Sequence, residues 1–255
     1  HLAVGMNYID VYHRTGLYPL PTPFTPGMEA CGVIEEVGDG VTHVKPGDRV
    51  AYGGGPVGAY AEVRVMPASV LVNVPDGISD EQAASIMVQG ATAEFLVRRT
   101  FKLQPGHTCL IHAAAGGVGL MLSQWAKHLG ATVIGTISTP EKAELARANG
   151  CDHPVLYTQE DVIKRVDELT DGQGVDVVYD SVGKDTFMAS LECLKPLGMM
   201  VSYGQASGPI PPFDIGLLVQ KGSLFLTRPS IMHYMLDDTA YRQGVAELFR
   251  LVEQG

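Results

Sequence analysis

The sequence predicts an α/β protein in which an all-β segment precedes a doubly wound parallel sheet. Up to about Pro75, short runs rich in Val, Ile and Ala are separated by turn residues. From Leu110 onward, apolar strands alternate with helical patterns, which is typical of a parallel sheet covered on both faces. A glycine-rich stretch, HAAAGGVG (112–119), joins the first of these strands to its helix.

Four short apolar runs define the β-rich segment. They are CGVIEEVG, RVAYGG, AYAEVRV and VLVNVP, and turn signals such as Gly38-Asp39-Gly40 and Pro46-Gly47-Asp48 separate them. A long helical pattern follows over 79–99. Ser79 is its predicted N-cap, because a hydroxyl can accept a bond from the first free backbone N–H groups.

The alternating segment contains six predicted strands with helices between them. The strands lie at 108–112, 132–138, 153–157, 175–180, 199–204 and 223–227. Gly130 and Gly150 follow two of the helices, where a left-handed residue ends a helix, and Pro140 stands at a first helical position.

Composition excludes some classes of protein. The chain has 255 residues and a net charge of −10, so we expect no nucleic-acid partner. No apolar run reaches the ~20 residues of a membrane span. The four cysteines are scattered, as expected of reduced thiols in a cytoplasmic protein. The first residue is His1, and we expect a fragment or a trimmed chain.

The glycine-rich stretch indicates a dinucleotide site. The three glycines of such a turn permit the tight turn, the approach of the pyrophosphate and the packing of helix on strand. Ala114, Gly116 and Gly119 take these three places, and Ala114 is tolerable at the first if its φ stays negative. A plain glycine-rich turn is the alternative. The strand before it and the helix after it favour a dinucleotide.

The end of the second strand of the alternating segment favours NADPH. NAD sites carry an acid there, whereas this chain has Ser138, with Lys142 in the first turn of the next helix. A lysine beside a helix N-terminus makes sense if an anion, such as the 2′-phosphate of NADP, lies there. Alone, Lys142 is equally consistent with a solvated surface lysine. Glu141 is the counter-argument, since it could face a ribose.

Several stretches resemble the quinone oxidoreductase/ζ-crystallin group of the medium-chain dehydrogenase/reductase superfamily. The glycine-rich signature at 106–127 is one. The others are GMNYIDVYHRTGLYP, PGMEACGVIEEVGDGV, KPGDRV, VVYDSVGKDTF and KGSLFLTRPS. The resemblance spans nearly the whole chain.

The resemblance implies a GroES-like catalytic domain over 1–88, lacking its first strands. It further implies a Rossmann NADP-binding domain over 89–228 and a shortened return to the catalytic domain over 229–255. The active cleft would lie between the two domains.

The resemblance also indicates whether this chain has the residues that bind zinc in the superfamily. Zinc alcohol dehydrogenases of the superfamily use a Cys and a His where this chain has Asn7 and Met28. We therefore expect no metal, and the chemistry must come from the cofactor and an acceptor that is already electrophilic.

The resemblance also assigns candidate site residues. The cofactor-binding set is Asn7, Tyr12, Thr92, Ala115, Gly116, Gly117, Val118, Gly119, Ser138, Lys142, Tyr157, Gly204, Gln205, Leu226 and Arg228. Tyr12 and Tyr18 are the candidates for the substrate. Taken singly, the tyrosines are equally consistent with half-buried packing residues, and Asn7 with a turn residue. No side chain is assigned as a catalytic acid.

The function implied is zinc-independent, NADPH-dependent quinone reduction by a cytoplasmic homodimer with an edge strand, SLFLT, at its interface. Two alternatives stay open. A reductase of the same fold could act on the double bonds of enones or enoyl thioesters. A cofactor-binding protein without turnover, structural or RNA-binding, is the other. The sequence leaves open the particular quinone or enone and the choice between one- and two-electron reduction.

Overall fold

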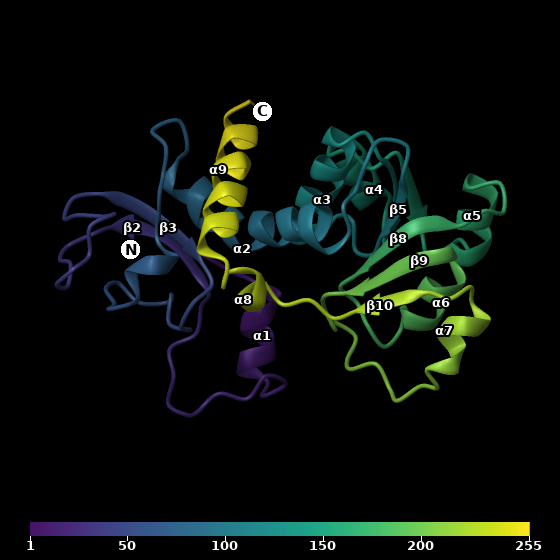
Figure 1. The fold of residues 1–255 in the computed structure, drawn as a ribbon, viewed down its shortest axis with the longest axis horizontal. Helices are drawn as coiled ribbons and strands as arrows, with labels where there is room; N and C mark the ends of the chain where they lie inside the picture. Colours follow the sequence, from purple (N-terminus) through teal and green to yellow (C-terminus); the bar gives the residue numbers. More distant parts are fainter. Residues whose placement is uncertain (255) are drawn as a thin grey trace. The chain divides into compact units, whose positions relative to one another are not determined.

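A computed structural model describes residues 1–254 (Figure 1). Two compact units divide the chain. The first contains His1–Thr92 together with the segment that begins at Ile231, and the second contains Ala93–Ser230. Each unit has its own sheet.

The second unit is built on a six-stranded parallel sheet of order β10-β9-β8-β5-β6-β7. Its strands are β5 (Thr108–Ile111), β6 (Thr132–Ile137), β7 (His153–Leu156), β8 (Val175–Asp180), β9 (Leu194–Ser202) and β10 (Phe225–Thr227). The chain runs outward from β5 through β6 to β7 and then returns to the other side of β5 at β8. This reversal creates a switch point at the carboxyl ends of β5 and β8, where ligands bind in such sheets.

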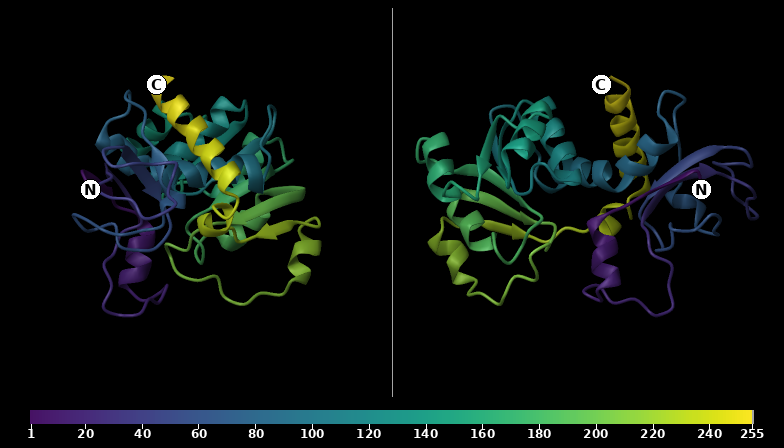
Figure 2. Two further views of the ribbon diagram at one scale, coloured as in Figure 1. Left: turned by 60° about the vertical axis from the view of Figure 1, so that its left-hand side comes forward. Right: turned by 180° about the vertical axis from the view of Figure 1, so that it is seen from behind.

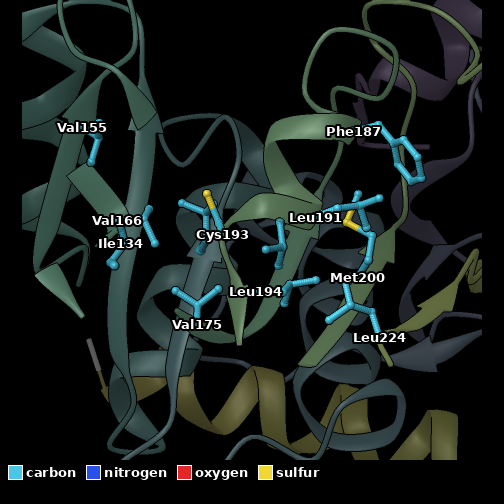
Figure 3. Close-up of a cluster of buried hydrophobic side chains, with 12 residues drawn as sticks. Ile134, Val155, Val166, Val175, Phe187, Leu191, Cys193, Leu194, Met200 and Leu224 are labelled. Atoms are coloured by element: carbon cyan, nitrogen blue, oxygen red, sulfur yellow. The ribbon is translucent and has the colours of Figure 1, made fainter. Parts of the chain in front are cut away.

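Helices cover this sheet. They are α3 (Gly117–His128), α4 (Pro140–Ala148), α5 (Val162–Leu169), α6 (Phe187–Glu192) and α7 (Gly216–Gln220). Successive residues of a strand face opposite sides, and in β5 both sides are buried: Cys109 and Leu110 are each 0% exposed. Leu110 belongs to a cluster with Ile134, Met200, Leu191 of α6 and Val166 of α5, and Figure 3 shows this core around β8 and β9. The predicted doubly wound α/β class is confirmed, because both faces of β5 are buried.

The first unit contains a four-stranded antiparallel sheet of order β1-β2-β3-β4. Its strands are β1 (Ala3–Gly5), β2 (Glu29–Val33), β3 (Arg49–Gly53) and β4 (Val72–Asn73). Its helices are α1 (Tyr8–Arg14), α2 (Asp80–Phe95, whose last turn enters the second unit), α8 (Ile231–Tyr234) and α9 (Asp238–Gln254). One face of the sheet packs Ala30, Val50 and Tyr52 into a small core.

Helix α9 returns to the first unit from the far end of the chain (Figure 2). Arg242 Nη1 donates to the carbonyl of Leu71 at 3.0 Å, and Nη2 donates to the carbonyl of Ser69 at 2.7 Å. A Cβ on Gly90 of α2 would lie 2.6 Å from Leu248 Cδ1, so this glycine lets α2 and α9 approach closely. Segments that lie 171 and 173 residues apart in the chain are therefore joined in one compact unit.

Two predictions for the first unit were wrong. The run AYAEVRV (59–65) is not a strand; its carbonyls at Ala61 and Glu62 bond to His1, and it forms no ladder with a described strand. Apolar alternation does not make a strand unless a neighbour satisfies its backbone. The expectation of an all-β segment also missed α1, which Asn7 and Asp10 mark as an N-cap and its third helical residue.

The predicted residues at the helix ends are confirmed. Ser79 Oγ accepts from Gln82 N at 3.2 Å and Gln82 Oε1 accepts from Ser79 N at 3.0 Å, a reciprocal capping box. Gly130 and Gly150 have φ of +80° and +93°. Pro140 is the first residue of α4. The helix over 79–99 departs from expectation only at its end, where Leu96–Thr100 widens to a π-helix.

All four cysteines are buried free thiols. Burial raises the pKa of Cys31 to about 11 and that of Cys193 to about 12, so both thiols are protonated and unreactive at neutral pH. Over the described part of the chain, no helix combines the length and apolar character needed to cross a membrane.

Candidate functional site

A pocket of about 410 Å³ opens at the carboxyl edge of the parallel sheet, beside the glycine-rich loop. Residues from the ends of β5, β6, β7 and β8 form it. The lining residues are His112, Ala113, Ala115, Gly116, Thr136, Ile137, Ser138, Lys142, Tyr157, Val162, Val182, Asp185, Thr186 and Ala189. Its position beside the switch point is where such sheets bind nucleotides.

The glycine-rich loop is held by the neighbouring strand β6. Thr136 accepts Ala113 N at its Oγ1 (3.3 Å) and Ala114 N at its carbonyl (3.2 Å). Ala113, with φ of +53°, is the left-handed residue, whereas Ala114 keeps a φ outside that region. Alanine at the first glycine place is therefore tolerated because the left-handed turn falls one residue earlier.

Alanine 114 also has a packing role. Its side chain is 0% exposed, and a Cβ on Gly135 of β6 would lie 2.6 Å from the Ala114 Cβ. The methyl group of Ala114 thus occupies space that the glycine of β6 leaves open.

The first turn of α3 presents free backbone donors. Gly116 is its N-cap, and Gly117, Val118 and Gly119 follow as the first three residues of a helix of 12 residues. Their N–H groups have no partner inside the helix, so they can bind an anion. A Cβ on Gly119 would overlap the carbonyl oxygen of Ala113 and lie 2.8 Å from Ala114 Cα, so this glycine is needed for packing. A Cβ on Gly116 would meet only Ala113 O, at 3.1 Å.

Three candidate phosphate-binding side chains line one pocket: Ser138, Lys142 and Tyr157. Thr139 caps α4 between the first two, since its Oγ1 accepts Lys142 N at 3.3 Å. The Lys142 side chain is exposed and Tyr157 is 54% exposed, so both can reach a ligand at the pocket mouth.

The counter-argument from Glu141 is not supported. Glu141 does not line the pocket. Its exposed carboxylate accepts a hydrogen bond from Thr139, which lowers the pKa of that carboxyl. Because Glu141 bonds to Thr139 and lies outside the lining, Lys142 and Asp185 are the charged side chains that line this pocket within residues 1–254.

Four polar lining residues are absent from the predicted set: His112, Thr136, Asp185 and Thr186. His112 and Thr136 stand at or beside the carboxyl ends of β5 and β6, so the rule that ligands bind there could have found them. The His112 ring is fully engaged, with Nδ1 3.0 Å from Thr136 Oγ1 and Nε2 3.0 Å from Ser190 Oγ. Burial lowers the pKa of His112, so the ring is neutral.

A second group of candidates lies on the other side of the switch point. Gly204 and Gln205 follow β9, and Arg228 follows β10, where its Nη1 donates to the carbonyls of Ser202 (2.7 Å) and Gly204 (3.1 Å). Leu226 is a β10 residue paired with Met200 and is 38% exposed. These residues do not line the pocket, but they share its sheet edge.

The remaining candidates belong to the first unit. Tyr12 and Tyr18 lie edge to face with ring centroids 5.0 Å apart, and Tyr8 extends the cluster at 5.3 Å from Tyr12. Asn7, just before α1, is 9% exposed. Thr92 lies in α2 and is 8% exposed.

The zinc positions of the superfamily hold other interactions here. Met28 is buried, and Asn7 Nδ2 donates to Glu29 Oε1 at 2.6 Å. Across residues 1–254, no three His, Cys, Asp or Glu side chains cluster in a way that could hold a metal ion. The pocket beside the glycine-rich loop suits a dinucleotide, because a glycine-lined helix start, a hydroxyl and a lysine surround it.

A GroES-like domain and a dehydrogenase nucleotide domain together define the class of protein. Residues 1–76 match the alcohol dehydrogenase GroES-like domain, and residues 117–251 match the zinc-binding dehydrogenase family. Within that class, the chain belongs to the quinone oxidoreductase family, as the resemblance implied.

Named relatives support this membership. The chain is 52% identical over 254 residues to a quinone oxidoreductase of Pseudomonas aeruginosa, covering 99% of this chain and 78% of the relative. It is 48% identical over 263 residues to a 2-haloacrylate reductase of a Burkholderia species, with the same two coverages. The crystal structure of Escherichia coli quinone oxidoreductase complexed with NADPH superposes with a TM-score of 0.96 at 45% identity, covering 99% of this chain and 78% of that one.

Proposed function

We propose that this protein is an NADPH:quinone oxidoreductase that works without a metal. The observation that carries the proposal is the pocket in which Ser138, Lys142 and Tyr157 stand beside the glycine-rich loop, where an NAD enzyme would place an acid. The membership in the quinone oxidoreductase family supports the same activity.

The chain's own residues hold the cofactor in this proposal. The N–H groups of Gly117, Val118 and Gly119 bind the pyrophosphate, together with Ala115 and Gly116 of the loop. Ser138, Lys142 and Tyr157 surround the 2′-phosphate. Lys142 supplies a charge and the others supply hydroxyl donors.

The remaining candidate residues bind the end of the cofactor that lies away from the 2′-phosphate. Gly204, Gln205, Leu226 and Arg228 bind it along the second half of the sheet edge, and Asn7, Tyr12 and Thr92 bind it from the first unit. Arg228 acts mainly by fixing the turn after β9, since it donates to Ser202 and Gly204. When bound, NADPH supplies the hydride that the acceptor needs.

The tyrosine cluster fits a flat acceptor. Tyr12 and Tyr18 form an edge-to-face pair, and aromatic rings pack favourably against further aromatic rings. We assign Tyr18 to the quinone and Tyr12 to both quinone and nicotinamide. The protein's contribution to the rate is then orientation of two bound molecules.

The proposal also covers the location of the protein in the cell and its oligomeric state. Four buried free thiols with no disulfide among the described residues suit the reducing cytoplasm. Strand β10 is an edge strand of the sheet with Phe225 56% exposed, so pairing of two β10 edges would make a homodimer. Light scattering of the wild type beside Phe225→Lys tests the dimer.

The activity test is NADPH oxidation against a panel of acceptors. Benzoquinones and naphthoquinones form one arm, and enones together with 2-haloacrylates form the second, because one relative is a 2-haloacrylate reductase. Faster turnover of quinones supports the proposal. Turnover of enones alone would make the protein a double-bond reductase, and binding without any turnover would leave only the cofactor-binding alternative.

A further inference from the structure

Glu29 is a carboxyl side chain enclosed in the first unit. It is the first residue of β2 and is 0% exposed. Its Oε1 accepts from Asn7 Nδ2 at 2.6 Å, and its Oε2 accepts from Val88 N in α2 at 2.7 Å. Within residues 1–254 no cation pairs with it. Burying an acid without a cation carries a desolvation cost, which points to a role beyond packing.

The backbone leaves a channel for this side chain. Gly5 of β1 stands opposite Glu29 in the sheet register. A Cβ on Gly5 would lie 2.5 Å from Glu29 Cγ and would overlap Glu29 Oε1 and the carbonyl of Ala84. The missing side chain at Gly5 therefore lets Glu29 cross from the sheet to the start of α1 and to α2.

The titratable groups around Glu29 are acids and phenols. Asp10 accepts from Tyr60 Oη at 2.8 Å and from Asn7 N at 2.9 Å, both at Oδ2, and Tyr241 also faces the site. His13 faces Asp10, and burial lowers the pKa of that ring. Burial, with a smaller contribution from the charge of Asp10, raises the pKa of Glu29 to about 7, although the bonds from Val88, Asn7 and Met87 lower it. Both protonation states are therefore populated near neutral pH.

We infer that Glu29 is a positioning residue of the nicotinamide site, whose carboxyl fixes the side-chain amide of Asn7 by tying it to helix α2. The inference rests on the proposed function, which assigns Asn7 to the cofactor. In the ionised form both carboxyl oxygens accept, so the Asn7 NH₂ group is held at Glu29. The Asn7 Oδ1 accepts from Asp10 N in the capping box of α1 and keeps a second lone pair for another partner. Protonation turns one oxygen into a donor, and either Asn7 or Val88 then loses its acceptor.

The substitution Glu29→Gln removes the charge of the side chain and keeps its shape. Glu29→Gln keeps one acceptor oxygen but places an NH₂ group against either Asn7 Nδ2 or Val88 N, both of which are donors. The variant therefore cannot satisfy both bonds at once. Glu35→Gln, on an exposed glutamate of the same unit, is the matched control.

The first measurement does not depend on activity. The Asn7 side-chain amide is assigned by NMR from its loss in Asn7→Ala and followed between pH 5 and 9. We expect its shifts to move with one midpoint in the wild type and in Glu35→Gln, and to stay flat in Glu29→Gln. Infrared difference spectra give the midpoint of the Glu29 carboxyl independently. An amide that does not titrate in the wild type, or that titrates equally in Glu29→Gln, overturns the inference.

The second measurement uses the proposed reaction. Glu29→Gln should lower kcat about tenfold, the effect of one hydrogen bond in a buried site. The NADPH dissociation constant should change less than about twofold, because the phosphates are held by the second unit. In an Asn7→Ala background, Glu29→Gln should cause no further loss, and the pH dependence of kcat near neutrality should be absent. Additive losses would overturn the inference.

The two proposals can fail separately. If the wild type reduces no acceptor while the Asn7 amide titrates with Glu29, the proposed function fails and the link between the two residues stands. If Glu29→Gln does not fold, the wild type and Asn7→Ala still decide. A pH limb of kcat that persists in Asn7→Ala contradicts the role of Glu29.

Discussion

Ser138 and Lys142 line the same pocket, although the N-cap of α4 separates them along the chain. Thr139 makes this possible. Its hydroxyl accepts Lys142 N at 3.3 Å, so the first turn of α4 starts directly after the carboxyl end of β6. The end of a strand and the positive start of a helix thus face one space, which suits a doubly charged phosphate.

Removing the lysine should weaken NADPH more than NADH. We expect Lys142→Ala to raise the NADPH dissociation constant about 10- to 100-fold, since one charge-assisted bond to a phosphate is lost. Calorimetric titration with both cofactors measures it. Lys102→Ala, at an exposed position outside the pocket, should leave both constants unchanged. Equal weakening of NADPH and NADH by Lys142→Ala would contradict the 2′-phosphate site.

An acid at the end of β6 should reverse the cofactor preference. Ser138→Asp places a carboxylate where NAD enzymes bind the ribose hydroxyls. It should lower NADPH affinity by about tenfold or more through like-charge repulsion, and keep or improve NADH affinity. Ser138→Ala is the control, because it removes the hydroxyl without adding a charge. An Asp variant that still prefers NADPH would show that Ser138 does not face the phosphate.

Substitutions of two glycines of the loop should affect different properties, one the stability and the other the binding of NADPH. Gly119→Ala places a Cβ against Ala113 and Ala114, so we expect a loss of about 1–3 kcal/mol in the free energy of unfolding. Gly116→Ala meets only one backbone oxygen at 3.1 Å and should keep its stability. Its methyl group would instead obstruct the pyrophosphate and weaken NADPH binding. Thermal melts with and without NADPH separate the two effects, and the prediction fails if both variants lose the same property.

The stability of the protein should fall as pH rises from 4.5 to about 7. The pKa of Glu29 is raised from 4.5 to about 7 by burial, so in this window the folded chain holds a proton that the unfolded chain has released. The free energy of unfolding therefore decreases with pH by up to about 1.4 kcal/mol per unit from this group.

Urea unfolding at several pH values checks this. Glu29→Gln should flatten that part of the profile, whereas Glu35→Gln should follow the wild type. An unchanged slope in Glu29→Gln would assign the effect to another group.

Local pattern and motif determined much of this protein. The alternation of strands and helices, the caps at Ser79 and Pro140 and the glycines at 130 and 150 depend on neighbours in sequence, so one sequence was enough to predict them. The grouping of Ser138 and Lys142 was equally predictable, because the carboxyl end of a parallel strand fixes where the next helix starts.

Only the tertiary structure decided the rest. Residues 59–65 have the pattern of a strand but make no ladder, since a strand needs a partner that sequence does not reveal. The left-handed residue is Ala113 rather than a glycine, because Thr136 of the next strand holds it. Glu29 looks like an ordinary surface acid in the sequence. Its burial between Asn7 and Val88 depends on the space at Gly5 and on the packing of α2, which are contacts between segments far apart in the chain.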